Sequence, residues 1–234
     1  SSGSDDASDG APLWEAALAP TGPGPTPSAE PVPVGPARLV RAPRVVLACS
    51  APAALRLLDG AGAIEEPAMP IPVGSPIARF TLVVRSPALA DAPVGSGLLV
   101  ADAGADSDCP VGAKALSHLS VKWPWIGADL TALHGPDAHA LRLSYGRPGR
   151  PRPDVDLDLA LADARILTGV RIDPADVIDS ALVRWDGTLP PATPEHRERV
   201  HRLLAQVRDL PGLTLTGAWV AGTGIAAVVE HARR

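Results

Sequence analysis

The stretch from Leu213 to Arg234 reads Leu-Thr-Leu-Thr-Gly-Ala-Trp-Val-Ala-Gly-Thr-Gly-Ile-Ala-Ala-Val-Val-Glu-His-Ala-Arg-Arg. Its first residues alternate with a period of two, which predicts a short strand. A segment rich in glycine and alanine follows, and after it Val228 and Val229 are expected to form the apolar side of a terminal helix. A strand, a glycine turn and a helix start together present backbone N–H groups and a positive dipole end to an anion or an electron-rich ligand.

The segment from Gly222 to Ala227 also fits G-x-G-x-x-G/A, the dinucleotide-binding fingerprint. A Rossmann unit requires a further strand after the helix and an acidic residue roughly 20 positions on. The sequence ends ten residues after Gly224, so this context is missing. The turn therefore contacts a part of a ligand other than a pyrophosphate, or its glycines only allow the terminal helix to pack close to the strand. This segment leaves both interpretations open.

Composition narrows the class of protein. The chain has 234 residues, of which 46% are apolar, enough for one large or two modest globular domains. Lys and Arg number 21 against 26 Asp and Glu, and the resulting charge of −5 argues against a nucleic-acid or anionic-membrane partner. No apolar run approaches the roughly 20 residues of a transmembrane segment, and no signal peptide is recognisable.

Motifs for common catalytic and metal sites are missing. Cys49 and Cys109 are too few for a disulfide scaffold, so two free thiols in a cytoplasmic protein are the simplest interpretation. The six histidines form no H-x-x-x-H or HExxH pattern, and no Ser lies in a G-x-S-x-G elbow. We therefore expect no metal and identify no catalytic residue.

The coarse layout is α+β. Residues 1–37 are rich in Ser, Asp, Pro and Gly and predict mostly loop or disorder. An apolar run at 45–48 predicts a buried strand that is followed by a helix capped at Ser50. One antiparallel sheet is predicted from residues 77–84, 97–100, 115–122 and 140–145. Helices at 154–168 and from Pro194, and a strand at 177–185, complete the prediction.

Trp123-Pro-Trp125 follows one of these strands. Two tryptophans two positions apart could form a platform on which a ligand stacks. Core and rim packing at the end of a strand is the commoner role for such a pair, and Trp185 is open to the same two interpretations.

Several blocks form a pattern when they are taken in order. They read Val45-Val-Leu-Ala-Cys-Ser-Ala-Pro, Ser96-Gly-Leu-Leu-Val100, Leu119-Ser-Val-Lys-Trp-Pro-Trp125, Leu141-Arg-Leu-Ser-Tyr-Gly-Arg147, Val183-Arg-Trp-Asp-Gly-Thr-Leu-Pro190 and Leu215-Thr-Gly-Ala-Trp-Val-Ala-Gly-Thr-Gly-Ile225. Over roughly residues 38 to 234, this series resembles the C-terminal half of the oxygen-dependent protoporphyrinogen and coproporphyrinogen III oxidases of haem synthesis, which belong to the flavin amine-oxidase superfamily.

The resemblance implies an α+β, partly α/β fold: the remnant of an FAD/NAD(P)-binding-type domain and the mixed-sheet substrate domain of the flavin amine-oxidase fold. By this resemblance, residues 38–60 are the return segment of the FAD domain, 61–176 bind the substrate and 177–234 form the C-terminal FAD-domain segment. Residues 1–37 remain outside both domains as loop or disordered chain.

FAD is the cofactor that the resemblance implies. Thr223, Gly224 and Ile225 would lie against the flavin ring, with the helix N-terminus directed at the edge that becomes negative on reduction. Trp185 would lie beside the FAD. The implied reaction is stepwise removal of hydride from a porphyrinogen to give the porphyrin, with molecular oxygen reoxidising the flavin. The resemblance does not choose between copro- and protoporphyrinogen.

Two departures from the family pattern change the expectation. The N-terminal half, which holds the pyrophosphate in the family, is not present, so we expect a separate N-terminal FAD-binding half as partner and an inactive chain without it. Ala192 stands where the family usually has an aromatic residue, and Ala226 where it has proline. The alternatives are another flavin amine-oxidase or desaturase-type oxidoreductase, or a truncated remnant that binds no FAD.

Overall fold

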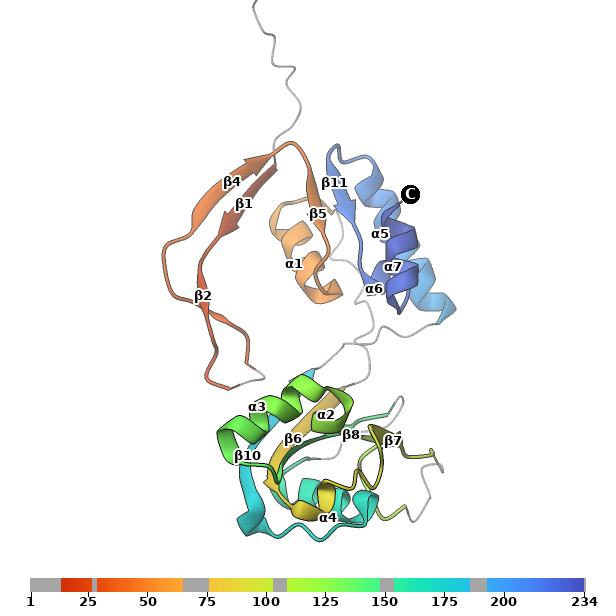
Figure 1. Ribbon diagram of the computed structural model, residues 1–234. Helices are drawn as coiled ribbons and strands as arrows, with labels where there is room; N and C mark the ends of the chain where they lie inside the picture. Colours follow the sequence, from red (N-terminus) through yellow and green to blue (C-terminus); the bar gives the residue numbers. More distant parts are fainter. Residues whose placement is uncertain are drawn as a thin grey trace, which may run out of the picture. The chain divides into compact units, whose positions relative to one another are not determined.

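The computed structural model describes residues 14–26, 29–64, 76–102, 109–147, 154–185 and 193–233. The fold divides into two compact units, each with its own core (Figure 1). The first unit comprises Ser1–Gly22, Pro31–Gly74 and Leu189–Arg234, and the second comprises Pro23–Glu30 and Ser75–Thr188. None of the helices in the described stretches is both long and apolar enough to span a lipid bilayer.

Two parallel strands from distant parts of the chain form the centre of the first unit. β5 (Val45–Leu47) pairs with β11 (Leu213–Leu215), and Leu47 lies opposite Leu215. Both strands lead towards helices, which confirms the strand–turn–helix predictions at 45–58 and at the C-terminal stretch. Parallel pairing explains why both strands are short and apolar, since helices must cover such a pair.

The helices of the first unit that the structure describes are α1 (Ala51–Gly60), α5 (Pro194–Arg208), α6 (Ala218–Ala221) and α7 (Ile225–Ala232). Apolar residues of α1, α5, β11 and α6 form one core, which includes Leu58, Val200, Leu203, Leu215 and Trp219. The other side of the parallel pair is not covered within the described residues, because the side chain of Val46 is 61% exposed and Thr214 is exposed.

The N-terminal region forms strands where loop or disorder was predicted. β1 (Trp14–Leu18) pairs antiparallel with β4 (Arg38–Ala42), and the short β2 (Thr21–Gly22) pairs with β3 (Val32–Pro33). The prediction was wrong here because pairing, and not apolar patterning, creates these strands. The Trp14 indole N–H also donates to the Pro211 carbonyl at 2.9 Å. Residues 1–13 of the predicted loop lie outside the described stretches.

A five-stranded antiparallel sheet forms the second unit. Its order is β10 (Val177–Trp185), β6 (Ile77–Arg85), β9 (Ala138–Tyr145), β8 (Ala115–His118) and β7 (Gly97–Leu99). The predicted sheet is confirmed in these strands. β10 pairs with β6 along its length, and the strand predicted at 177–185 is confirmed there.

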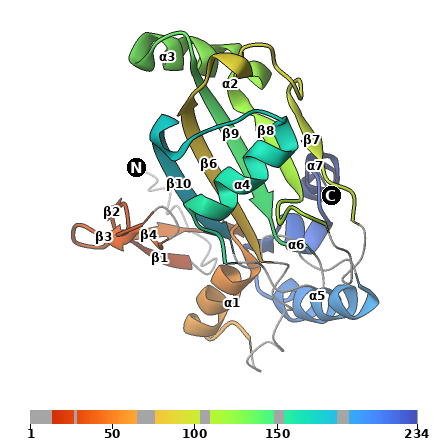
Figure 2. The same ribbon diagram turned by 90° about the horizontal axis from the view of Figure 1, so that it is seen from below.

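One face of this sheet is covered by α4 (Leu157–Thr168) (Figure 2). The Asp156 carboxylate caps the helix by accepting from the Leu159 N–H at 2.9 Å, and Gly169 ends it with φ of 68°. The helix predicted at 154–168 is thereby confirmed within three residues. The core beneath it includes Phe80, Leu82, Leu141, Leu143, Leu161 and Ala164. Two short 3₁₀ turns lie at Pro87–Leu89 and Pro174–Asp176.

Two helices replace the predicted end of the 115–122 strand. α2 (Leu119–Lys122) begins directly after β8, and α3 (Pro124–His134) follows. Alternation alone predicted a strand through Lys122, but the backbone turns into α2 directly after His118. Pro124, which has the fixed φ that suits a first helical turn, begins α3. The Trp123 and Trp125 side chains are 47% and 64% exposed, so they are not part of the core.

Candidate functional site

The C-terminal glycine turn is built on the end of β11. Gly217, with φ of 118°, turns the chain into α6, and Gly222 and Gly224 have φ of 100° and 112°. Such angles are open to glycine and strained for other residues. Gly224 is the N-cap of α7, and three of the predicted site residues, Thr223, Gly224 and Ile225, are consecutive here.

The turn leaves donors and space at the start of α7. The first N–H of the helix to find an intrahelical acceptor is that of Val228, which bonds to the Gly224 carbonyl at 3.2 Å. The N–H groups before it have no partner inside the helix, by the geometry of any helix start. A Cβ added at Gly222 or Gly224 would meet nothing within 4 Å, and Ile225 is 84% exposed. An electron-rich group could approach these donors.

A buried tryptophan fixes the base of the turn. Trp219 in α6 is 6% exposed and its indole N–H donates to the Cys49 carbonyl at 3.0 Å. The carbonyl of Trp219 lies 3.0 Å from Nε2 of His196, which is buried in α5. The turn is therefore attached to both the end of β5 and α5, so its position is set by residues far away in sequence.

The same geometry determines what a larger residue at Gly224 would cost. The Cβ position is open, so the cost comes from the left-handed backbone, which is strained for any residue with a side chain.

Trp185, the remaining predicted site residue, lies at the end of β10 in the second unit. Its side chain is 42% exposed, and the Arg79 guanidinium carbon lies 5.4 Å from the ring centroid. This cation–π contact joins two neighbouring strands on one face of the sheet. The structure thus gives Trp185 a described partner, Arg79, that sequence reasoning did not single out.

Arg79 and Arg142 lie on the sheet face opposite α4. Arg79 pairs with Ser144, and Arg142 pairs with both Thr81 and Ser117. Directly opposite residues on neighbouring strands share a face of the sheet. The alternate residues, such as Phe80 and Leu143, lie on the other face and pack against α4. Both arginines are half-buried, and the Nε atom of each is enclosed without a hydrogen-bond partner among the described residues.

Two further cations lie near this pair. Burial lowers the pKa of Lys114, and the charges of Arg147 and Arg79 lower it further. Burial and the charge of Arg79 likewise lower the pKa of Arg142. We call Arg79, Lys114, Arg142 and Arg147 the basic cluster. Repulsion within the basic cluster favours a bound anion.

The acidic groups near the basic cluster neutralise it only in part. Arg147 lies 4.0 Å from the Asp102 carboxylate and donates to the Val100 carbonyl at 3.0 Å. Asp179 occupies the same face as Arg79 at the far end of β10, opposite Val83, where its carboxylate accepts from the Ser180 N–H. Neither carboxylate forms a described ion pair with Arg79 or Arg142.

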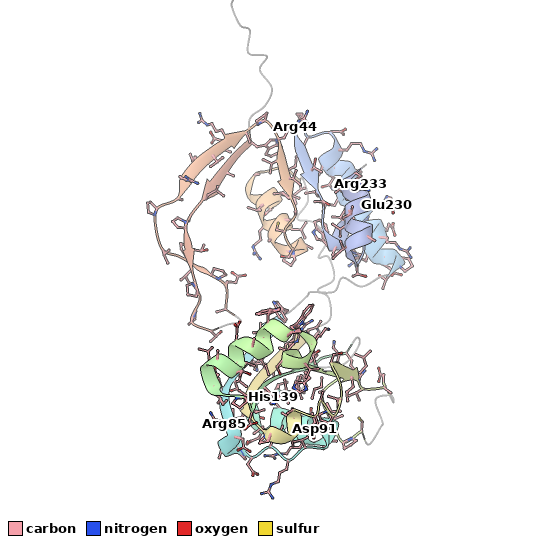
Figure 3. All side chains as sticks on the ribbon, viewed as in Figure 1. Arg44, Arg85, Asp91, His139, Glu230 and Arg233 are labelled. Atoms are coloured by element: carbon pink, nitrogen blue, oxygen red, sulfur yellow. The ribbon has the colours of Figure 1, made fainter. Side chains whose placement is uncertain are left out.

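A second group that sequence reasoning missed is a buried histidine pair. Nε2 of His118 lies 3.2 Å from Nδ1 of His139, and their exposed fractions are 0% and 8%. Figure 3 shows His139 inside the second unit, whereas Arg85 and Asp91 lie at its surface. Burial and the neighbouring His139 lower the pKa of His118 to about 4, and burial also lowers that of His139.

We expect this pair to make the second unit unstable in acid. Above pH 6.5 His118 is neutral in both the folded and unfolded chain and has no effect. Between pH 6.5 and 4 only the unfolded state takes up the proton, so the free energy of unfolding falls by about 2–3 kcal/mol. Urea unfolding between pH 7 and 4 measures this loss, and His118→Gln should reduce the slope while the exposed His134→Gln leaves it unchanged. An identical slope in wild type and His118→Gln would contradict the assignment.

Two further sequence expectations concern the site. Ala192, where the family has an aromatic residue, lies outside the described stretches. In the part of the chain that the structure describes, no three His, Cys, Asp or Glu residues form a group that could hold a metal ion. Cys49 and Cys109 are both exposed, and neither forms a disulfide within the described residues.

Together these features define a mixed α and β protein of two units, one with a parallel pair that ends in an open glycine turn and one with a basic sheet face. No family model matches the sequence, and no curated protein matches it. Among solved structures, the crystal structure of reduced UDP-galactopyranose mutase matches with a TM-score of 0.51 and 12% sequence identity. The match covers 80% of this chain and 38% of that one. At this identity, the likeness shows the fold alone.

Proposed function

We propose that the chain is part of an FAD-dependent oxidase that converts a porphyrinogen into the porphyrin with molecular oxygen as acceptor. The observation that carries this proposal is the turn from Gly222 to Ile225, where a helix N-terminus opens onto free space. The order of the sequence blocks supports the porphyrinogen as substrate. The fold that the chain shares with an enzyme crystallised in a reduced form agrees with redox chemistry.

The residues of the turn fit one edge of a flavin. The N–H groups of Ile225 and Ala226 and the dipole of α7 would stabilise the negative charge that a reduced flavin carries at that edge. Gly222 and Gly224 bring no side chain into the open space above the turn. Bound FAD would supply the redox chemistry, by accepting the hydrogens of the porphyrinogen and passing them to oxygen. The chain itself would hold the ring and the substrate.

We further propose that a separate FAD-binding half completes the first unit. Parallel sheets are usually buried on both faces and contain more than two strands. Here the described pair of β5 and β11 leaves Val46 exposed, and α7 buries none of its residues. A partner that adds strands and covers this side would also bring the pyrophosphate-binding loop. The turn at Gly222–Ile225 lacks the following strand and acidic residue that accompany such a loop.

The test combines flavin binding and turnover. The 234-residue chain alone should not retain FAD through gel filtration. Produced together with an N-terminal FAD-binding half, it should co-purify with flavin absorbance. It should oxidise a porphyrinogen continuously in air, and without oxygen it should stop once its flavin is reduced. Porphyrin fluorescence measures both. Gly224→Val should abolish this flavin retention, because the side chain would enter the space above the turn.

Gly62→Val is the matched control, because Gly62 also has a positive φ, of 61°, with open space at its Cβ, and lies in the same unit. It should also strain the backbone, though less than at Gly224 because φ of 61° lies in the left-handed helical region, and it should leave flavin retention intact. Tight FAD binding by the chain alone would contradict the need for a second half. Flavin retention by the two halves without porphyrin formation would favour another flavin oxidoreductase, and no flavin in either sample would favour a remnant that binds none.

A further inference from the structure

Two members of the basic cluster, Arg79 and Arg142, are half-buried and form no described ion pair. Nε of both Arg79 and Arg142 is enclosed and has no acceptor in the described stretches. Leaving a buried donor unpaired costs about 1–3 kcal/mol, and more when the group is charged. Half-buried arginines that also repel one another lower the stability of the sheet. An anionic acceptor from outside the described residues would satisfy both donors and offset this repulsion.

The position of the cluster suggests how a ligand would lie. Arg79 and Arg142 are on adjacent strands, one opposite Ser144 and the other two residues before it, so their guanidinium groups are diagonal neighbours. Lys114 donates its backbone N–H to the Ser144 carbonyl at 2.7 Å, which places it at the same end of the sheet. The aromatic ring of Trp185 lies beside Arg79 on this face.

We propose that this face of the sheet binds the carboxylate groups of a tetrapyrrole, with Arg79 and Arg142 as the anion-binding residues. This inference rests on the proposed function and specifies its substrate. Guanidinium groups bind carboxylates through two parallel hydrogen bonds, which would satisfy the enclosed Nε atoms. The exposed ring of Trp185 offers a flat surface to the macrocycle.

The charge of the cluster favours the substrate with more carboxylates. Coproporphyrinogen carries four propionates, whereas protoporphyrinogen carries two and has vinyl groups in place of the others. Three cations of the cluster, Arg79, Lys114 and Arg142, have no described ion pair, and they outnumber the two carboxylates of protoporphyrinogen. The proposed substrate is therefore the coproporphyrinogen type.

Equilibrium titration of the full 234-residue chain with coproporphyrin III, followed by porphyrin fluorescence, tests the proposal without flavin. Coproporphyrin III should bind at least about 10-fold more tightly than protoporphyrin IX, and added salt should weaken its binding. Arg79→Gln and Arg142→Gln should each weaken it about 10-fold, the magnitude of one charge-assisted hydrogen bond. Arg79→Lys should restore part of the affinity, because it restores the charge without the fork.

Arg171→Gln is the charge-matched control, because Arg171 is in the same unit with an exposed side chain that meets Asp173. The Arg171→Gln variant should bind coproporphyrin III as tightly as the wild type does. Thermal unfolding provides a second readout: Arg79→Gln should keep the midpoint, because relief of the repulsion with Arg142 offsets the loss of the cation–π contact with Trp185. A lower midpoint would show that Arg79 is a structural residue.

The outcomes separate this inference from the proposed function. Equal affinity of both porphyrins, or no effect of either arginine substitution, would overturn the inference even if the flavin experiment succeeds. Displacement of coproporphyrin by equimolar UDP would also overturn it, by showing a site for phosphate-bearing ligands. Arginine-dependent, coproporphyrin-selective binding would support it even in a chain that forms no active oxidase.

Discussion

Replacing Asp163 by alanine should lower the free energy of unfolding of the second unit by about 3 kcal/mol. Asp163 lies in α4 and its side chain is almost fully buried. Its two carboxylate oxygens accept from the backbone N–H groups of Gly112 and Ala113 at 3.2 and 2.8 Å. Alanine would leave both donors without an acceptor and detach the segment before β8 from the helix.

The electrostatic surroundings agree with this structural role. Burial raises the pKa of Asp163, and the hydrogen bonds from Ala113 and Gly112 act in the opposite direction. The neighbouring Tyr145 is fully buried, and burial together with the charge of Asp163 raises the pKa of its hydroxyl. The carboxylate is thus stabilised mainly by backbone donors, which an alanine at this position cannot replace.

Amide hydrogen exchange read by mass spectrometry resolves the two units. Asp163→Ala should lower protection in peptides from β6 and β9 and leave β5 and β11 unchanged. Asp163→Asn retains one side-chain acceptor, so its free energy of unfolding should fall by roughly half as much as that of Asp163→Ala. Asp158→Ala, on the exposed side of the same helix, should cost no more than about 0.5 kcal/mol through the helix dipole. Equal protection in Asp163→Ala and wild type would contradict the role of the buried carboxylate.

Trp219→Ala should destabilise the first unit by about 4 kcal/mol, a typical cost for removing a buried tryptophan. The ring is part of the core formed by α1, α5 and β11. Its N–H holds the Cys49 carbonyl at the end of β5. Because α6 connects β11 to the glycine turn, the substitution should also disorder the start of α7.

Two variants separate packing from hydrogen bonding. Trp219→Phe retains most of the apolar area but loses the donor to Cys49, and should cost about 1–2 kcal/mol. Trp125→Ala removes an exposed tryptophan from the second unit and should cost less than about 0.5 kcal/mol. Hydrogen exchange in peptides from β11 and α5 is the measurement. A smaller loss in Trp219→Ala than in Trp219→Phe would be incompatible with this account.

Much of the secondary structure could be predicted because local patterns and contacts agree there. The alternation in β6 and β9, and the capping residues Asp156 and Thr193, specify their elements without help from the rest of the chain. The errors occurred where distant partners decide the conformation. β1 exists through its pairing with β4, and alternation past His118 predicted a strand where the backbone forms α2.

The candidate site likewise has one part that the sequence predicts and one part that it does not. The glycine turn was predictable, because a strand, closely spaced glycines and an apolar helix are adjacent in sequence. The basic cluster was not predicted. Arg79 and Arg142 each interrupt a segment that alternates with apolar residues, and this pattern was the signal for it in the sequence. Only strand register shows that both lie on one face.

The sequence by itself therefore determined the two strand–turn–helix segments, the antiparallel strands, the longer helices and the open glycine turn at the C-terminal stretch, since each depends on residues within a few positions of one another. The tertiary structure alone decided that β5 pairs with β11, that His118 meets His139, that Asp163 holds Gly112 and Ala113, and that Arg79 and Arg142 share a face. These relations join residues separated by long stretches of chain. Burial and hydrogen-bond partners set them, and neither is encoded in local pattern.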